Sequence, residues 1–428
     1  MLFDIVIVGG GAGGLELAAT LGRRLGRKLG PEKILLIDQA GFHVWKPSLH
    51  EVAAGTLDIH QEGLSYPILA RRNHFSFTLG ELRGLDTQHS KLTLGGITDD
   101  DGREIVPVRE VTFRWAVLAI GSGSNFFGTP GAAEHSFVLE RVADAERFRR
   151  RLLASFTRVS FANDKQMKVA IVGGGATGVE LSAELLEAHA ELMEGVGSEQ
   201  RFRLDIAIVE AGPRILNGLP ENISERATRA LEDRHVKVIT NTPVTSVTED
   251  GLLTESGLVA ADLVVWAAGI KAAQSNQDLG LHTNQANQFV VDDRLQTSAE
   301  GIYAMGDCAA VVWHDERLVP ARAQAAHQQA EYLLTELLAQ LRNQTPPTVP
   351  FQYKDFGSLV SLGEDSGVGT LMGVLAGKNF LVEGLIAKWM YMSLHLNHHR
   401  AILGTRGTAV LAIARLLQRR VSGRLKLH

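Results

Sequence analysis

The chain has 428 residues, of which 45% are hydrophobic, 44 are glycine and 12 are proline, and its formal net charge is −5. This composition predicts an ordered α/β protein of two or three domains and excludes a low-complexity or disordered chain. Cys308 is the only cysteine, which excludes an internal disulfide bond and fits a reducing compartment.

One pattern occurs twice, as DIVIVGGGAGGLELAATL at 4–21 and as KVAIVGGGATGVELSAEL at 168–185. Each copy is an apolar run followed by G-x-G-x-x-G and an amphipathic run, which predicts a strand, a tight turn and a helix. The glycines are Gly9, Gly11 and Gly14 in the first copy and Gly173, Gly175 and Gly178 in the second. Such a turn lets the backbone approach a pyrophosphate at a helix N-terminus, so two dinucleotide sites are predicted.

An acidic residue ends a later apolar strand in each half of the chain. Asp38 closes KILLID and Glu210 closes LDIAIVE. A carboxylate there can accept hydrogen bonds from ribose hydroxyls, and Glu210 would repel a 2′-phosphate, which favours NADH over NADPH. The alternative is a pair of glycine turns that bind nothing, and we disfavour it because two complete patterns coincide.

Later segments return the chain to these two sites. WAVLAIGSGSN at 115–125 and LVVWAAG at 263–269 each predict a strand that ends in a glycine turn. Asp307 is expected between the end of a strand and the start of a helix, where it could hold flavin ribityl or pyrophosphate groups. An ordinary helix cap is the alternative.

The last 45 residues contain no Asp or Glu and carry eight basic residues. One apolar stripe of a predicted helix consists of Val410, Ile413, Ala414, Leu417 and Val421. Arg415 and Arg419 lie opposite, and Trp389 and Tyr391 suit a boundary between water and lipid. The segment is either packed on the body or lies in an anionic membrane surface, and we favour the membrane. No apolar run is long enough to span a bilayer.

Metal and nucleic-acid binding receive little support. His395, His398 and His399 have no carboxylate or cysteine nearby in the sequence, so we interpret them as interfacial residues. The basic residues are mixed with a long apolar face, which is not typical of a nucleic-acid surface.

Several of these segments carry a family resemblance. IVIVGGGAGG, VAIVGGGATGVE and GIYAMGD resemble the flavoproteins with two dinucleotide-binding domains. FHVWKPSLHEVAAGTLD at 42–58 resembles the flavin-contacting loop of type II NADH dehydrogenases, and AQAAHQ at 323–328 matches their A-Q-x-x-x-Q motif. LVEGLIAKWMYMSLHLNHH and the closing RLKLH are similar to the proteobacterial members.

The resemblance implies an α/β fold with two Rossmann-like domains, for FAD and NADH, and a C-terminal amphipathic helical membrane anchor. We expect the FAD domain at 1–160 and 286–383, the NADH domain at 161–285, and the anchor at 384–428. The residues expected to bind FAD are Gly9, Gly11, Ala12, Gly13, Gly14, Asp38, Gln39, Lys46, Gly121, Asp307, Ala323 and Gln324. Those expected to bind NADH are Gly173, Gly175, Thr177, Gly178, Glu180, Glu210, Ala268 and Gly269.

The activity implied by the resemblance is hydride transfer from NADH to FAD and two-electron transfer to a membrane quinone, without proton pumping. Glu180, Gln324 and Gln328 are the expected catalytic residues. By the family pattern, Glu180 orients the nicotinamide and relays a proton, whereas a surface glutamate near a helix N-terminus is the alternative. The amides of Gln324 and Gln328 share one helix face and can bond flavin and quinone oxygens without changing charge. His327 is either a proton donor or a structural hydrogen-bonding residue.

The cysteine content excludes two related classes of flavoprotein, and two other functions stay open. Flavoprotein disulfide reductases and sulfide-oxidising quinone reductases need more cysteine than Cys308 alone. An NADH-dependent reductase of a ferredoxin or rubredoxin and a nucleotide-binding membrane scaffold remain as alternatives.

We expect a peripheral protein on the cytoplasmic side of the inner membrane. The sequence leaves open the quinone, either ubiquinone or menaquinone, and the oligomeric state, a homodimer being one option.

Overall fold

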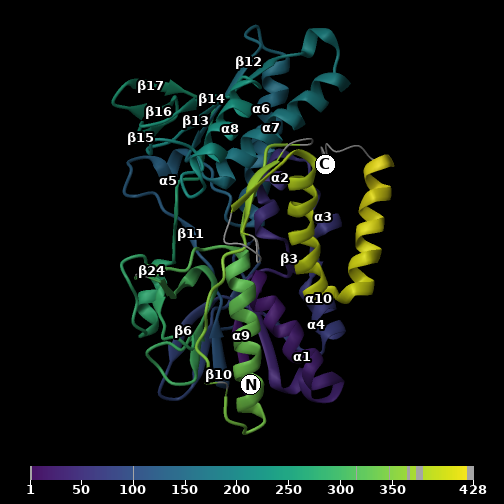
Figure 1. The fold of residues 1–428 in the computed structure, drawn as a ribbon, viewed down its shortest axis with the longest axis vertical. Helices are drawn as coiled ribbons and strands as arrows, with labels where there is room; N and C mark the ends of the chain where they lie inside the picture. Colours follow the sequence, from purple (N-terminus) through teal and green to yellow (C-terminus); the bar gives the residue numbers. More distant parts are fainter. Residues whose placement is uncertain are drawn as a thin grey trace.

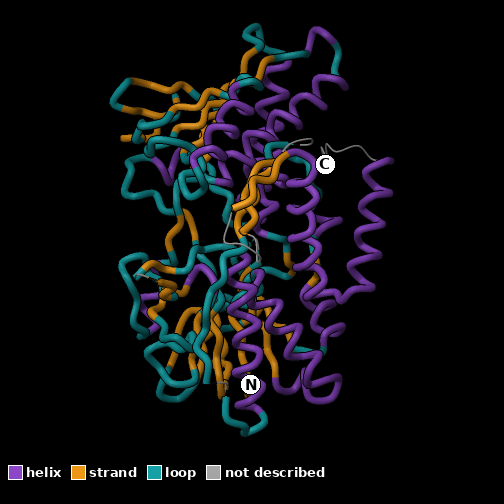
Figure 2. The backbone as a smooth tube through the Cα atoms, viewed as in Figure 1, coloured by secondary structure: helices purple, strands orange, loops and turns teal. Residues whose placement is uncertain are grey.

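The computed structural model describes residues 2–99, 101–314, 316–346, 348–363, 367–372 and 379–421. It shows two α/β bodies, one above the other in Figure 1, with a pair of C-terminal helices along one flank. The tube in Figure 2 shows that both bodies combine strands with helices, and that in the upper body the strands reach the left edge of the view while helices lie to their right.

The lower body is built on the sheet that contains the first glycine loop. Its strands, in spatial order, are β5 (Ser76–Leu79), β2 (Ile34–Asp38), β1 (Leu2–Val8), β10 (Arg109–Leu118), β7 (Lys91–Leu94) and β6 (Leu82–Asp86). The first four run parallel, and β21 (Ile302–Ala304) adds to β10, also in parallel. A strand that follows the second glycine loop in sequence therefore completes the first sheet.

The upper body holds the second glycine loop. Its four parallel strands, in spatial order, are β14 (Lys237–Ile239), β13 (Arg203–Val209), β12 (Gln166–Val172) and β18 (Leu263–Trp266). An antiparallel sheet of β15 (Val244–Thr248), β16 (Gly251–Thr254) and β17 (Gly257–Ala260) lies beside it. The helices here are α5 (Ala132–His135), α6 (Val142–Ser160), α7 (Ala176–Gly195) and α8 (Glu221–Glu232).

Helices and small strand pairs complete the lower body and the connection between the bodies. The helices are α1 (Ala12–Lys33), α2 (Leu49–Ala54), α3 (Ile59–Glu62), α4 (Tyr66–Asn73) and α9 (Ala323–Leu341). The pairs are β3 (Phe42–His43) with β4 (Leu64–Ser65), β8 (Ile97–Thr98) with β9 (Glu104–Val106), β11 (Gly123–Ser124) with β19 (Ile270–Lys271), β20 (Phe289–Val290) with β22 (Ala309–Ala310), and β23 (Val312–His314) with β24 (Arg317–Leu318).

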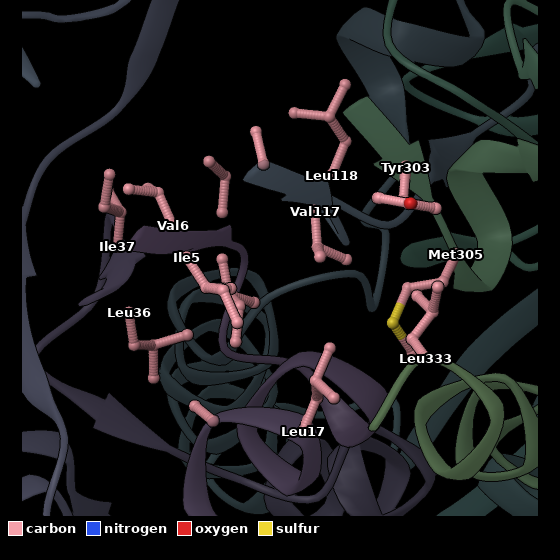
Figure 3. Packing of buried hydrophobic residues seen from close by; sticks show 14 of the residues in the cluster. Ile5, Val6, Leu17, Leu36, Ile37, Val117, Leu118, Tyr303, Met305 and Leu333 are labelled. Atoms are coloured by element: carbon pink, nitrogen blue, oxygen red, sulfur yellow. The ribbon is translucent and has the colours of Figure 1, made fainter. Parts of the chain in front are cut away.

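The core of the lower body follows from the sequence of its strands. Parallel strands covered by helices on both faces are buried on both faces, so they consist of nearly continuous Val, Ile and Leu. Ile5, Val6, Ile37 and Val117 are all buried in this core. Ile5 lies on the side of the strands that faces Leu17 of α1, whereas Val6 and Ile37 lie on the opposite side (Figure 3). This packing fixes the carboxyl ends of β1 and β2 beside each other.

The C-terminal part folds back onto both bodies. A three-stranded sheet of β25 (Gly357–Ser361), β26 (Gly367–Met372) and β27 (Asn379–Glu383) leads into α10 (Gly384–Val421). Gly404 has a φ of 72°, which breaks α10 into two arms that run side by side, shown in yellow in Figure 1. The first arm contacts α1 and α4. In the described residues, no helix is both long and apolar enough to cross a membrane.

Candidate active site

The two glycine loops have the same geometry. The Gly10 backbone N–H donates to Asp38 Oδ2 at 2.6 Å, and the Gly174 N–H donates to Glu210 Oε2 at 2.6 Å. The other oxygen of each carboxylate accepts from the turn that follows its own strand, at Ala40 and Gly212 respectively. Both acids are therefore held at the carboxyl edge of a parallel sheet, where ligands of such folds bind.

The third glycine of each loop is required by packing. A Cβ on Gly14 would lie 2.0 Å from the Gly9 carbonyl oxygen, and one on Gly178 would lie 2.2 Å from the Gly173 oxygen. Gly9 and Gly173 have φ values of 105° and 104°, a left-handed conformation that favours glycine. Strand and helix therefore pack closely at both turns.

The second glycine of each loop leaves space for a ligand. Gly11 and Gly175 precede α1 and α7, and a Cβ on either would meet no described atom within 4 Å. Among the described side chains, none caps these two N-termini, and their first turns contain no acid. Exposed N–H groups and the helix dipole make both positions suitable for a pyrophosphate, so the residues fit FAD and NADH.

Further predicted FAD residues surround the first loop. Gly121 has a φ of 72° and open space where a Cβ would point. Asp307 accepts a hydrogen bond from Ser122 Oγ at 3.0 Å. The helix expected after Asp307 is absent, because Gly306–Cys308 form a single 3-10 turn and β22 follows directly. Asp307 can act through its carboxylate, but the predicted helix dipole does not exist at this position.

The other predicted cofactor residues lie around the two loops. Lys46 pairs with Glu140 at 2.7 Å, and Gln39 and Thr177 are exposed. The remaining positions are Ala12, Gly13 and Ala323, at the first turns of α1 and α9, and Ala268 and Gly269, in the turn that begins one residue after β18. These positions alone do not show which of these residues contact a nucleotide. Their roles in binding stay predictions.

Glu180 is buried, and its surroundings favour the protonated carboxyl. It is 6% exposed, its Oε1 accepts from the Ser361 N–H at 3.1 Å, and its Oε2 lies 3.5 Å from His50 Nδ1. Burial raises the pKa of Glu180 to about 8 and lowers the pKa of His50 to about 4. The surface alternative is therefore wrong for Glu180. His50 was not predicted as a partner, because no local sequence pattern connects it with α7.

Gln324 and Gln328 both contact the segment before β25. The Tyr353 hydroxyl donates to Gln324 Oε1 at 2.7 Å. Gln328 Nε2 donates to the Lys354 carbonyl at 2.8 Å, and the Lys354 N–H donates to Gln328 Oε1 at 3.0 Å. The amide of Gln328 thus holds the neighbouring backbone. The adjacent Gln329, not predicted, accepts from the Gly306 N–H at 2.7 Å.

The C-terminal histidines were predicted as interfacial, and the structure contradicts this for two of them. His398 and His399 are 2% and 3% exposed. They are buried because the first arm of α10 packs against α1 and α4. His398 Nδ1 lies 2.6 Å from Glu16 Oε1, so this histidine belongs to a polar cluster inside the protein.

Cys308 is a buried structural residue. Its thiol donates to the carbonyls of Leu118 and Met305, and burial raises its pKa to about 11. A thiol in this state is a poor nucleophile.

Comparison with known proteins assigns the chain to a family. Residues 3–330 match the pyridine nucleotide-disulphide oxidoreductase family. A type II NADH:quinone oxidoreductase from Haemophilus influenzae is 38% identical over 99% of this chain and its own full length. The chain belongs to the type II NADH:quinone oxidoreductases. This confirms the resemblance predicted from the glycine loops, 42–58 and 323–328.

Solved structures of the same fold extend the comparison. NDH2 from Plasmodium falciparum in complex with NADH has a TM-score of 0.79, 18% identity and 99% coverage of both chains. The sulfide:quinone oxidoreductase of Aquifex aeolicus has a TM-score of 0.71 and 16% identity and covers 98% of this chain and 95% of its own. At these identities the likeness concerns the fold, and the predicted α/β class is confirmed.

Proposed function

We propose that this type II oxidoreductase transfers hydride from NADH to FAD and passes two electrons to a membrane quinone, without proton pumping. The observation that carries the proposal is the 38% identity over the whole chain to the Haemophilus enzyme. The two open glycine loops support it, because each offers a helix N-terminus to a pyrophosphate and a carboxylate to a ribose.

Each site has a defined part in this activity. FAD, when bound, supplies the redox chemistry by accepting hydride from NADH and giving electrons to the quinone. The first loop and Asp38 would hold FAD, and the second loop and Glu210 would hold NADH. Glu180 is proposed to orient the nicotinamide and to hold a proton on its buried carboxyl. Gln324 and Gln328 stay our candidates for bonds to flavin and quinone oxygens.

The domain limits are part of the proposal. The lower sheet takes β1 and β21 from distant parts of the chain, while the upper sheet takes only strands between Gln166 and Trp266. This arrangement supports an NADH domain inserted into a discontinuous FAD domain, which we propose at 161–285 and at 1–160 with 286–383. The helices α5 and α6 within 132–160 nevertheless pack in the upper body. The segment 384–428 is proposed as the membrane anchor.

The function is tested through its two half-reactions. Anaerobic mixing of the FAD-loaded protein with NADH should bleach the flavin absorbance, and a soluble short-tail quinone should then restore it. Restoration by a ferredoxin or rubredoxin, but not by quinone, would establish the alternative of a soluble carrier.

Coenzyme choice is expected to depend on Glu210. In Glu210→Gln the carboxylate charge is lost, while one side-chain oxygen can still accept a backbone hydrogen bond. The ratio of kcat/KM for NADH to that for NADPH should fall about tenfold or more, because a 2′-phosphate is no longer repelled. Steady-state kinetics with both coenzymes measure it. Glu225→Gln, which removes an exposed acid from α8, should leave the ratio unchanged, and an unchanged ratio in Glu210→Gln would remove the proposed role.

The second arm of α10 presents an apolar surface. Val410, Ile413 and Leu417 are 68%, 58% and 61% exposed, whereas Arg415 on the other side pairs with Glu62 of α3. The arm is thus packed on the body through its basic side, and its stripe is outermost. We propose that this stripe inserts into an anionic bilayer surface on the cytoplasmic side of the inner membrane. A homodimer stays a prediction.

Parts of the predicted anchor lie outside the residues that the structure describes. Residues 422–428, with Arg424 and Lys426, lie outside the described residues, as do the side chains of Lys388, Trp389, Tyr391 and Arg419. The membrane proposal therefore depends on Val410, Ile413 and Leu417.

Ile413→Glu should weaken membrane binding by about tenfold or more, because it removes buried apolar area and places a like charge against anionic lipid. Cosedimentation with phosphatidylcholine vesicles containing phosphatidylglycerol measures this. Ile105→Glu is the matched control, because Ile105 is 62% exposed in β9, far from α10 in sequence. Equal binding of the two variants would contradict the assigned surface.

A further inference from the structure

The two glycine loops differ in how the carbonyl group at their centre is held. In the second loop, the Gly174 carbonyl accepts from the Leu216 backbone N–H at 2.7 Å. In the first loop, the equivalent Gly10 carbonyl accepts from two side chains, the Tyr66 hydroxyl at 2.7 Å and His43 Nδ1 at 3.0 Å. The first loop thus depends on side chains where the second loop uses the backbone.

The Gly10 peptide lies in the middle of the loop that is proposed to hold FAD. Gly10 is buried and its N–H donates to Asp38, while Gly11 precedes the open space in front of α1. Five of the six residues at 9–14 are glycine, so this backbone has many conformations open to it. Hydrogen bonds that fix the peptide before FAD binds reduce the entropy that is lost on binding.

The His43 side chain is oriented by a histidine of α10. Burial lowers the pKa of His43 well below its usual value, which keeps its ring neutral. A carbonyl can only accept, so the bond to Gly10 requires the single proton of His43 on Nδ1 and leaves its Nε2 as an acceptor. His43 Nε2 lies 2.9 Å from His398 Nε2. Donation from His398 therefore keeps His43 in the tautomer that bonds the loop.

His398 is held in turn by an acid of α1. Its Nδ1 lies 2.6 Å from Glu16 Oε1, and His327 Nδ1 of α9 bonds the other oxygen, Oε2. Burial alone would raise the pKa of Glu16, but the bonds from His327 and His398 outweigh it, so its pKa lies below the usual value. An ionised carboxylate can only accept, so in this arrangement His398 donates from both of its nitrogens and its charge is offset by Glu16.

This series of bonds is shielded from water and joins distant parts of the chain. Glu16, His43 and His398 are 5%, 5% and 2% exposed. The Trp45 ring lies 4.2 Å from the His398 ring between centroids, so the first arm of α10 also packs on the segment 42–58. The series is complete only when this arm is docked on the body.

We propose that the first arm of α10 is part of the FAD site, where His398 acts through His43 to hold the first glycine loop in the conformation that binds FAD. The inference rests on the proposed binding of FAD at this loop. His398 and His43 are positioning residues, because they act on the loop. Docking of the arm should thus govern the retention of FAD but not the affinity for NADH, and bound FAD should stabilise the docked arm by the same factor.

His398→Phe removes both N–H donors and keeps a ring of similar size against Trp45. FAD should leave the FAD-loaded full chain about fivefold faster or more, the lower end of coupling between linked sites. The rise of flavin fluorescence after dilution into FAD-free buffer measures this rate. The Kd for NAD⁺, from titration calorimetry, should be unchanged. His399→Phe is the matched control, because His399 is a buried neighbour that bonds the His395 carbonyl, and it should release FAD at the unmodified rate.

His43→Asn tests whether His398 acts through His43. The asparagine amide can donate to the Gly10 carbonyl and has no tautomer, so its donation does not depend on His398. In this background, His398→Phe should no longer accelerate FAD release. An equal acceleration in both backgrounds would overturn the coupling, because independent sites have additive effects.

A second variant of the arm keeps the test decisive if His398→Phe fails to fold. That variant leaves Glu16 ionised and buried with one partner fewer, which is destabilising. Glu16→Gln combined with His398→Phe removes this charge, and the glutamine can still accept from His327. It should accelerate FAD release as His398→Phe does, and circular dichroism reports its folding. Release at the unmodified rate would overturn the proposal.

Tyr66→Phe examines the Gly10 carbonyl directly. It removes the other donor to this carbonyl and keeps the buried ring, so FAD release should rise about threefold or more, the effect of one hydrogen bond. Tyr332→Phe is the control, because the Tyr332 hydroxyl bonds the Val349 carbonyl at 3.3 Å. Equal release by the two variants would show that the Gly10 carbonyl does not control FAD retention.

Gly11→Val separates this inference from the proposed function. A Cβ at Gly11 meets no described atom within 4 Å, so the fold accommodates the valine, which should block FAD at the helix N-terminus. If Gly11→Val retains FAD as the unmodified protein does, the assignment of FAD to the first loop fails. If Gly11→Val loses FAD but His398→Phe releases it at the unmodified rate, that assignment stands and the role of α10 is overturned. Equal acceleration by His398→Phe and His399→Phe would overturn it in favour of general packing.

Discussion

Gly175→Val is expected to weaken NADH binding about a hundredfold or more, while the protein keeps its fold and its FAD. The new side chain meets no described atom within 4 Å, so the folded state accommodates it. It would occupy the space before the α7 N-terminus, where the pyrophosphate is proposed to bind. NADH titration of the FAD-loaded protein measures the Kd, and flavin absorbance and circular dichroism report FAD content and folding.

Two glycine variants of the same region serve as comparisons. Gly195→Val, at the other end of α7, also places its Cβ in open space and should leave the Kd unchanged. Gly178→Ala should destabilise the protein, because its Cβ would lie 2.2 Å from the Gly173 carbonyl oxygen. Unchanged NADH affinity in Gly175→Val would show that NADH does not use this loop.

Glu180→Gln should change both stability and activity in a pH-dependent way. Burial raises the pKa of Glu180 to about 8, above the 4.5 of an unburied glutamate. Because the folded-state pKa is the higher one, the contribution of Glu180 to stability is complete below about pH 4.5 and is lost as pH rises to about 8. Relative to Glu180→Gln, the free energy of unfolding should therefore fall across this window by on the order of 1 kcal/mol per pH unit.

The same substitution tests the proposed role in the reaction. A carboxyl that is protonated at neutral pH can donate a proton, whereas an amide of the same shape cannot, so turnover should fall about tenfold or more. Urea unfolding from pH 5 to 8 and steady-state kinetics measure the two effects. Glu194→Gln, an exposed acid at the end of α7, should alter neither. A stability difference that does not vary with pH would show that Glu180 is ionised when folded.

Short sequence motifs predicted the parts of the site whose residues lie close together in the sequence or at the end of a predicted strand. The glycine loops, Asp38 and Glu210 were identified because strand, turn and helix are adjacent in sequence and the same pattern occurs twice. The resemblance also predicted that the chain re-enters the FAD domain after the NADH domain. The addition of β21 to the first sheet agrees with this. These features depend on backbone conformation and on the parallel sheet edge, which short motifs encode well.

Contacts between distant segments were not predictable in this way. His398 and Glu16 are 382 residues apart, and His50 approaches Glu180 from a different element. The outward direction of the Ile413 stripe depends on the break at Gly404, which a helical periodicity across 384–421 does not reveal. In each case the packing of whole elements decides whether a polar residue is buried.

The stoichiometry of NADH oxidation in the purified, FAD-loaded protein with a soluble short-tail quinone tests the proposed transfer of electrons from NADH to quinone. NADPH and quinone-free reactions are run in parallel. We expect one quinol to form for each NADH consumed, a rate with NADH far above that with NADPH, and little NADH consumption without quinone. NADH consumption that continues unchanged without quinone, or flavin bleaching that quinone does not reverse, would contradict it.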